Sequence, residues 1–345
     1  MNNKYVDKFW SDVLDFCVTG NQEITMRFYI TLLILTGIVF AGPASLNKAL
    51  GSPWDVGSFL SGLKVQVTTK EDASGSDWHG EKVNIFRVPN TSEHLNEFFE
   101  WLGHDLEDGS RVVQPIFVQR FPPDYPDLRS VDKRKELFVE IVLPLILREN
   151  ARLLNMRQKI TGLSGKKTLS PEEQEWLNSL YKKYKLEDNK NMTALLDRVD
   201  AVPAGLALAQ AANESGWGTS RFSRLGNAVY GQWTWSSKDQ GIVPLDREEN
   251  KRHRIRAFED LYGSVRSYML NLNRHRSYEP FRNLRKEFRA RGEGVNSFIM
   301  AEGLKNYSTK RQKYVVHIRS LLTQNNFSRY DNYILNPYIE VPGQL

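Results

Sequence analysis

The spacing of apolar residues divides the chain into a mixed first part and a helical second part. Alternating apolar and polar residues predict short strands at 64–69 and 82–88. Leu95, Phe98, Phe99 and Leu102 have the i, i+3, i+4, i+7 spacing of an amphipathic helix. Apolar periodicity and start signals predict further helices at 133–156, 170–185, 194–199, 203–213, 264–273 and 311–325. The segment 159–169 predicts a linker, and Pro144 is expected to kink the helix that contains it.

One stretch of the second part has strand character. Residues 230–258 combine Gly, Trp and Pro with short polar–apolar alternation, which predicts a small β-hairpin lobe. Together these patterns predict an α+β fold that is mainly helical, with a helical region before the part that carries this lobe.

An uncharged run near the N-terminus bears on the compartment. Residues 28–45 carry no charge, and the apolar centre, 28–41, is short for a membrane span but near the upper length of a signal-peptide core. Ala41, Gly42 and Ala44 then supply the small residues of a cleavage region. A buried core helix is the alternative to export, but we expect a signal peptide, starting at Met1 or Met26, or a single membrane anchor. Either predicts that the rest of the chain lies in the periplasm or cell envelope.

Composition narrows the class of protein further. The chain has 345 residues, 40% hydrophobic and 26% charged, which excludes a collagen-like or wholly disordered chain. The formal net charge of +6 suits an anionic partner without choosing one. The basic run 274–291 predicts a solvated face, for which an anionic wall or membrane surface is a more natural partner than nucleic acid. We expect no nucleic-acid binding.

The cysteine and histidine residues of the sequence do not indicate a disulfide or a metal site. The single cysteine, Cys17, excludes an internal disulfide and a Cys-rich zinc site. The 6 histidines show no ligand spacing. We therefore predict no metal and no cofactor.

The chemically informative stretch is 202–233. Pro203 opens a helix of small apolar residues, Glu214 arrives at its C-terminal end, and Gly216 stops it. Burial and the negative end of the helix dipole both raise the pKa of such a carboxyl, which suits a general acid. The alternative is a helix-ending glutamate in an ion pair with Arg221 or Arg224.

The segments AQAANESGWGTSRF and GNAVYGQW resemble the glucosaminidase-type peptidoglycan hydrolases, family 73 of the glycoside hydrolases. The pattern over 115–325, including VLPLILRENARLL and GLKNYS, resembles the Bax-like bacterial proteins. The resemblance implies a lysozyme-like catalytic domain that hydrolyses the β-1,4 bond after N-acetylglucosamine in peptidoglycan, with Glu214 as general acid. Together with the patterns above, the resemblance leads us to expect five divisions of the chain. They are an extension with signal peptide or anchor (1–45), a loop-rich region with short strands and a helix (46–130), a helical region packing on the catalytic domain (131–190), the catalytic domain (191–326) and a tail (327–345).

The resemblance also implies a second carboxylate on the β-lobe. Glu248 and Glu249 are the candidates, and because they are adjacent, only one of them can face the cleft from a strand. Tyr307 matches a family tyrosine near the acetamido subsite, although Ser308-Thr309-Lys310 replaces the usual Ala-Thr-Asp. The positions expected to contact the glycan strand are Trp217, Asn227, Tyr230, Gln232 and Trp233.

Two other functions fit the same residues. A wall-binding scaffold would keep the fold without turnover, which the departure after Tyr307 and the undecided second carboxylate would permit. A lytic transglycosylase would need no second carboxylate. The sequence leaves retaining and inverting outcomes open, because they depend on the carboxyl separation.

Overall fold

The computed structural model describes residues 66–71, 82–87, 91–101, 104, 106, 109–187, 190–245, 247–248 and 250–336. The predicted signal peptide or anchor, Cys17 and Glu249 lie outside the described residues. Within the described part of the chain, no helix combines the length and apolar character needed to cross a membrane.

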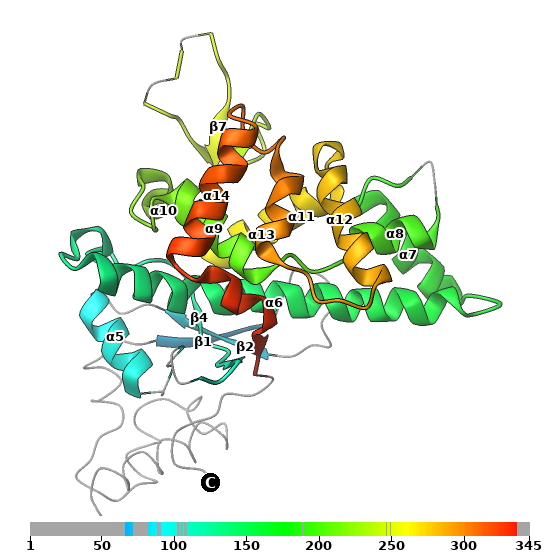
Figure 1. Ribbon diagram of the computed structural model, residues 1–345, viewed down its shortest axis with the longest axis horizontal. Helices are drawn as coiled ribbons and strands as arrows, with labels where there is room; N and C mark the ends of the chain where they lie inside the picture. Colours follow the sequence, from blue (N-terminus) through cyan, green and yellow to red (C-terminus); the bar gives the residue numbers. More distant parts are fainter. Residues whose placement is uncertain are drawn as a thin grey trace, which may run out of the picture.

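The long helix α6 (Val131–Ser164) runs along one side of the molecule, beneath the helices of the C-terminal half (Figure 1). Ser130 caps it by accepting a hydrogen bond from the Lys133 backbone N–H, and Pro144 lies inside it. The linker predicted at 159–169 is wrong over its first half. The helix continues to Ser164 because Ile160 and Leu163 are buried in an apolar cluster.

That cluster joins α6 to the next two helices. The capping box of Ser170 and Glu173 opens α7 (Pro171–Lys183), as the sequence predicted, and Asn191 caps α8 (Met192–Arg198). Leu177, Leu180 and Leu195 bury their side chains against the C-terminal half of α6. This second, smaller core fixes the far end of the long helix.

The remaining helices surround α9 (Ala204–Ser215), whose residues 204–212 are all buried. They are α10 (Arg221–Gly226), α11 (Leu261–Arg274), α12 (Glu279–Ala290), α13 (Ser297–Met300) and α14 (Gln312–Gln324), with the 3-10 turns η3 (Arg276–Tyr278), η4 (Ala301–Leu304) and η5 (Phe327–Asn332). Small residues let these neighbours approach α9 closely. A Cβ on Gly205 would lie 2.7 Å from the carbonyl carbon of Phe327.

The described ranges also form three small sheets. In the first part, β1 (Gln66–Glu71) pairs antiparallel with β2 (Lys82–Arg87), which pairs parallel with β4 (Phe117–Val118). In the chain, the helix α5 (Ser92–Trp101) lies between β2 and β4, and the 3-10 turn η2 (Tyr125–Asp127) follows β4. In the second sheet, β3 (Val112–Val113) pairs parallel with β8 (Ile334–Leu335). The two strands predicted before residue 90 are confirmed.

The predicted β-hairpin lobe is the third sheet. Its strands β5 (Trp233–Thr234), β7 (Arg254–Arg256) and β6 (Gly241–Ile242) lie in that order and are antiparallel, and Figure 1 shows the lobe projecting from the helices. The predicted α+β, mainly helical fold class is confirmed.

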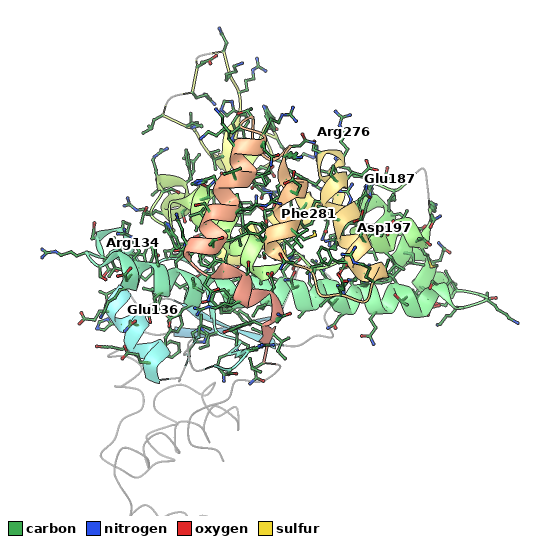
Figure 2. The ribbon with its side chains drawn as sticks, viewed as in Figure 1. Arg134, Glu136, Glu187, Asp197, Arg276 and Phe281 are labelled. Carbon is green, nitrogen blue, oxygen red and sulfur yellow. The ribbon has the colours of Figure 1, made fainter. Side chains whose placement is uncertain are left out.

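The basic run 274–291 corrects one expectation. It forms α12, and Arg282 and Arg285 are buried instead of solvated. The Arg285 guanidinium donates to the Ala201 carbonyl and to Asn273 Oδ1, both at 2.8 Å, and lies 3.8 Å from the buried Asp200 carboxylate. Phe281 on the same helix points into the interior, whereas Arg276 lies at the periphery (Figure 2).

Candidate active site

The C-terminal end of α9 presents Glu214. The helix stops because Gly216 takes a left-handed conformation (φ 57°), which glycine adopts without strain. Gly218 is held close to Phe121, whose ring a Cβ would meet at 2.8 Å. Glu214 is half-buried there, so its carboxyl is fixed by the fold and still accessible.

One carboxyl oxygen of Glu214 is fully engaged. Oε1 accepts a hydrogen bond from the Tyr314 hydroxyl and another from Asn213 Nδ2, each at 2.9 Å. The other oxygen, Oε2, faces Gly231, where a Cβ would lie 3.9 Å away. Because two donors fill the lone pairs of Oε1, an acidic proton belongs on Oε2.

Asn213 is itself oriented by a histidine on α14. His317 Nε2 lies 2.9 Å from Asn213 Oδ1, and an amide oxygen only accepts, so the ring nitrogen donates. This contact leaves the amide NH2 of Asn213 pointing at Glu214.

A buried chain of hydrogen bonds leads to the Tyr314 hydroxyl. The Tyr268 hydroxyl donates to Gln210 Oε1 at 2.6 Å, and Gln210 Nε2 donates to the Tyr314 oxygen at 2.9 Å. With its lone pair used by Gln210, the Tyr314 hydroxyl has its proton directed to Glu214. This series of hydrogen bonds therefore fixes the direction in which Tyr268, Gln210 and Tyr314 each donate.

Stacked tyrosines enclose this network. Tyr307 stacks on Tyr314 with 5.4 Å between ring centroids, and Tyr230 stacks on Tyr268 at 3.8 Å. Burial raises the pKa of Tyr278 to about 12, and burial raises the pKa values of Tyr268, Tyr307 and Tyr314 well above their usual range. The hydroxyls therefore stay protonated as donors.

The Glu214 carboxyl has a raised pKa. Burial is the largest cause, and it outweighs the hydrogen bonds from Tyr314 and Asn213 and the charges of His317 and Lys310, which lower the pKa. Among the described residues, Glu214 makes no ion pair with Arg221 or Arg224. The environment favours a protonated acid.

The β-lobe brings aromatic and amide side chains next to this acid. Trp233 follows Gly231 by two residues, is 57% exposed, and stacks one face on His253 at 4.3 Å between ring centroids. Gln232 is partly buried, and its Oε1 has no hydrogen-bond partner among the described residues. Trp233 therefore offers an open ring face, whereas the unpartnered oxygen of Gln232 is buried.

Asn227 and Trp217 have contacts of other kinds. Asn227, in a left-handed conformation, donates from Nδ2 to the carbonyls of Phe258 and Glu259, which ties the loop before the lobe to its end. The Trp217 ring packs against Phe138 and Phe327. It also lines a hollow of about 290 Å³ on the α6 side.

Glu248, the described candidate for a second carboxylate, makes no hydrogen bond to Glu214. Glu248 is exposed on the segment between β6 and β7, and no carboxylate in the described ranges is hydrogen bonded to Glu214. The described residues also contain no group of three or more potential metal ligands.

Sequence reasoning missed the residues that hold the acid. Gln210, Tyr268 and Tyr314 were expected only as helical positions, and Asn213 and His317 were not singled out. One signal was available: Gln210 is a polar residue in an otherwise apolar helix, four positions before Glu214 and so on the same face.

A mainly helical domain that holds a partly buried glutamic acid of raised pKa beside a small β-lobe has the general architecture of glycosidase-like folds. Comparison with known proteins identifies the family. The glucosaminidase family model, described as mannosyl-glycoprotein endo-beta-N-acetylglucosaminidase, matches residues 190–327. Protein bax of Escherichia coli (strain K12) is 31% identical over 208 residues, covering 58% of this chain and 74% of that protein. The chain belongs to the Bax-like family of glucosaminidase-domain proteins, which confirms the resemblance found in the sequence.

A solved structure is also similar in part. The catalytic domain of the autolysin Auto from Listeria monocytogenes aligns over 51% of this chain and 96% of that domain, at 15% identity and a TM-score of 0.26.

Proposed function

We propose that this protein is an exported peptidoglycan hydrolase, an endo-β-N-acetylglucosaminidase that uses Glu214 as its general acid. The observation that carries the proposal is the asymmetric carboxyl of Glu214. Its Oε1 is held by Tyr314 and Asn213, its Oε2 faces the β-lobe, and its pKa is raised by burial.

In this mechanism the proton on Oε2 passes to the glycosidic oxygen as the bond to the sugar breaks. The developing negative charge on Glu214 is then shared with the two donors at Oε1. Because hydrogen bonds to an ionised acceptor are stronger than those to a neutral one, Tyr314 and Asn213 stabilise the product carboxylate more than the acid.

The oxocarbenium-like sugar also needs stabilisation from its other face. Glu248 and Glu249 remain the proposed second carboxylates, on a segment that follows β6. Assistance by the substrate's acetamido group is the alternative, with Tyr307 beside that group. Gln232 and Trp233 are the proposed glycan contacts of the lobe, whereas Tyr230, which is 1% exposed, is proposed with Asn227 and Trp217 as a supporting position.

The test is digestion of purified sacculi, followed by mass spectrometry of the released muropeptides. We expect fragments with reducing N-acetylglucosamine ends from the natural protein, and Glu214→Gln should release them at least about a hundredfold more slowly. Glu175→Gln, an exposed carboxylate on α7, serves as the matched control and is expected to digest normally.

The same experiment separates two alternatives. Exposure of Glu248 favours reactions that need no second carboxylate, and a lytic transglycosylase would release anhydromuramyl ends. A non-catalytic scaffold would bind sacculi and leave them intact. Either result would overturn the hydrolase proposal.

A further inference from the structure

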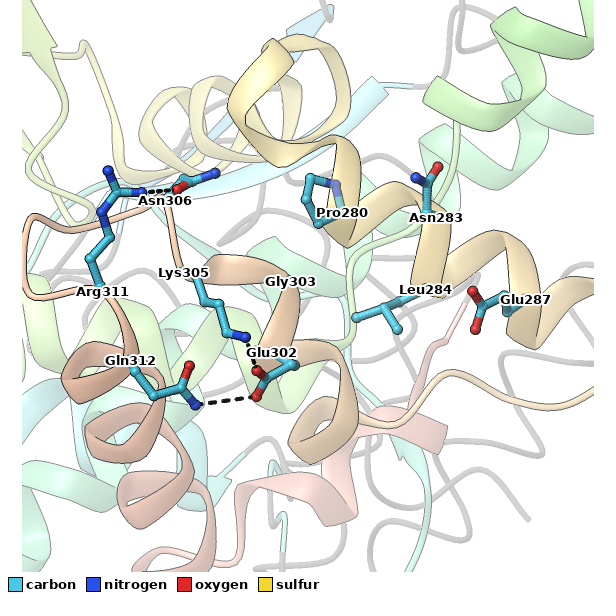
Figure 3. Close-up of a pocket in the computed structure, with 10 residues that line it drawn as sticks. All are labelled: Pro280, Asn283, Leu284, Glu287, Glu302, Gly303, Lys305, Asn306, Arg311 and Gln312. Atoms are coloured by element: carbon cyan, nitrogen blue, oxygen red, sulfur yellow. Dashed lines mark hydrogen bonds and ion pairs between the residues drawn. The ribbon is translucent and has the colours of Figure 1, made fainter.

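A pocket distinct from the Glu214 site lies between α12, η4 and the start of α14 (Figure 3). Its volume is about 680 Å³, which is within the size range of small-ligand sites. Pro280 and Leu284 supply apolar surface, and Asn283 and Asn306 supply amide groups. It is larger than the hollow beside Trp217.

One charged residue of the pocket is already neutralised within the fold. Glu302 pairs with Lys305 Nζ at 2.5 Å and with Arg319 at 3.1 Å. Its carboxylate therefore has no need of a ligand cation.

Two other charges are left for a ligand. Figure 3 shows Arg311 and Glu287 at opposite ends of the pocket. Within the described ranges neither has an ion-pair partner, and Arg311 uses its guanidinium for a hydrogen bond to Asn306 Oδ1. A guanidinium has five N–H donors, so most of them remain for a ligand.

The backbone at Arg311 is also unusual. Its φ of 50° and ψ of −121° lie in a region that residues with a side chain rarely occupy. Outliers of this kind cluster at functional sites, where the surrounding structure holds them. The strained residue directs its side chain to the pocket and also begins α14, which carries Tyr314.

We propose that this pocket binds the stem peptide of peptidoglycan, with a peptide carboxylate on Arg311 and the ammonium of its diamino acid at Glu287. This rests on the proposed function. The argument is charge complementarity: N-acetylglucosamine is neutral, whereas a stem peptide carries both charges on a short amide backbone. Arginine recognises carboxylates in a two-pronged geometry.

The segment 305–312 connects the two sites. Asn306 and Arg311 line the pocket, while Tyr307 stacks on Tyr314 and the charge of Lys310 lowers the pKa of Glu214. The protein would therefore prefer glycan strands that retain their peptides.

Direct binding tests the pocket independently of cleavage. The full chain is titrated calorimetrically with the tetrapeptide L-alanyl-D-glutamyl-diaminopimelyl-D-alanine. We expect Arg311→Gln and Glu287→Gln each to raise Kd about tenfold or more, since each removes a charged hydrogen-bonding partner. Lys167→Gln and Glu175→Gln, exposed residues on the α6–α7 side, are expected to bind as the natural protein does.

A second arm compares kcat/KM on glycan strands with peptides and on strands stripped by an amidase. The ratio of the two values should fall about tenfold in Arg311→Gln, in line with the lost binding. No peptide binding, or equal binding by all variants, would overturn the pocket proposal even if glycan is cleaved. Peptide binding without cleavage would support the pocket and refute the proposed hydrolase.

Discussion

The Tyr314 hydroxyl donates a 2.9 Å hydrogen bond to Oε1 of Glu214 across a sequence separation of 100 residues. The contact joins the end of α9 to the first turns of α14. It selects which carboxyl oxygen carries the proton, because Asn213 occupies the remaining site on Oε1. The hydrogen bonding of the Glu214 carboxyl therefore depends on the packing of α9 against α14 as much as on the position of Glu214 in the sequence.

Tyr314→Phe should move the alkaline limb of kcat/KM to higher pH. The tyrosine hydrogen bond lowers the pKa of Glu214, so its removal raises that pKa further, and a general acid stays active up to its own pKa. The measurement is a pH–rate profile on glycan strands. Tyr333→Phe, whose hydroxyl bonds the Leu106 carbonyl instead, is the control and should leave the limb in place.

Glu214→Gln should lower kcat by about 10² to 10⁴, the usual contribution of a general acid. It should not destabilise the protein. The raised pKa means that ionised Glu214 opposes folding at pH 7, a cost that disappears below the unfolded value of about 4.3. Thermal melts should show the variant at least as stable as the natural protein at pH 7, with any advantage gone at pH 4. A lower melting temperature at pH 7 would contradict the assigned burial.

Asp200→Asn should destabilise the fold by about 3–5 kcal/mol, the typical effect of breaking a buried ion pair. Arg289 donates to both Asp200 oxygens, at 2.7 and 3.0 Å, and the variant leaves the buried Arg285 without its anion. The Asp197–Lys286 pair is far more exposed, so Asp197→Asn is the control and should cost less than about 1 kcal/mol. Urea unfolding measures both.

Asp200 should also make the stability of the fold sensitive to acid. Burial alone would raise its pKa, but the hydrogen bond from Arg289 and the charges of Arg285, Arg289 and Arg157 hold the pKa below its usual value. A depressed carboxyl pKa gives stability that is present above the unfolded value of about 3.9 and is lost as the pH falls through the folded pKa. The free energy of unfolding should therefore fall less steeply with acid in Asp200→Asn.

Gly205→Ala should cost about 1–3 kcal/mol through overpacking, because a Cβ would lie 2.7 Å from the Phe327 carbonyl carbon and 2.9 Å from Ser297 Oγ. Gly162→Ala on α6 is the matched control. Its Cβ would meet nothing within 4 Å, so the change should stabilise the helix by about 0.5–1 kcal/mol. Chemical denaturation of the two variants should give opposite signs.

Trp233→Ala should weaken glycan binding about threefold to tenfold, in keeping with the loss of one aromatic stacking partner. The ring is 57% exposed, so the fold should be little affected. Titration with glycan fragments measures the effect. Phe298→Ala, which changes an exposed aromatic residue on α13, provides the comparison. An equal loss of glycan affinity in both variants would contradict a role of the β-lobe in binding.

Local signals were sufficient for much of this molecule. The Pro203 start and Gly216 stop placed Glu214 at a helix end, and the capping box placed α7, because backbone geometry at these positions depends on adjacent residues. Burial of Ile160 and Leu163 extended α6 beyond its predicted end. Only packing against α7 and α8 could reveal that, since 159–169 has the composition of a loop.

The sequence by itself determined the position of Glu214 at the end of its helix and the family to which the chain belongs. The tertiary structure decided how that acid is held. Gln210 lies on α9 itself, whereas Tyr268 and Tyr314 lie on α11 and α14. The two tyrosines look like ordinary helical positions until those helices pack against α9. The basic run 274–291 shows the same limit, because Asp200, which neutralises Arg285 and Arg289, is supplied from a distant part of the chain. Local sequence encodes helix boundaries, whereas the electrostatic environment of a side chain depends on residues that only folding brings near.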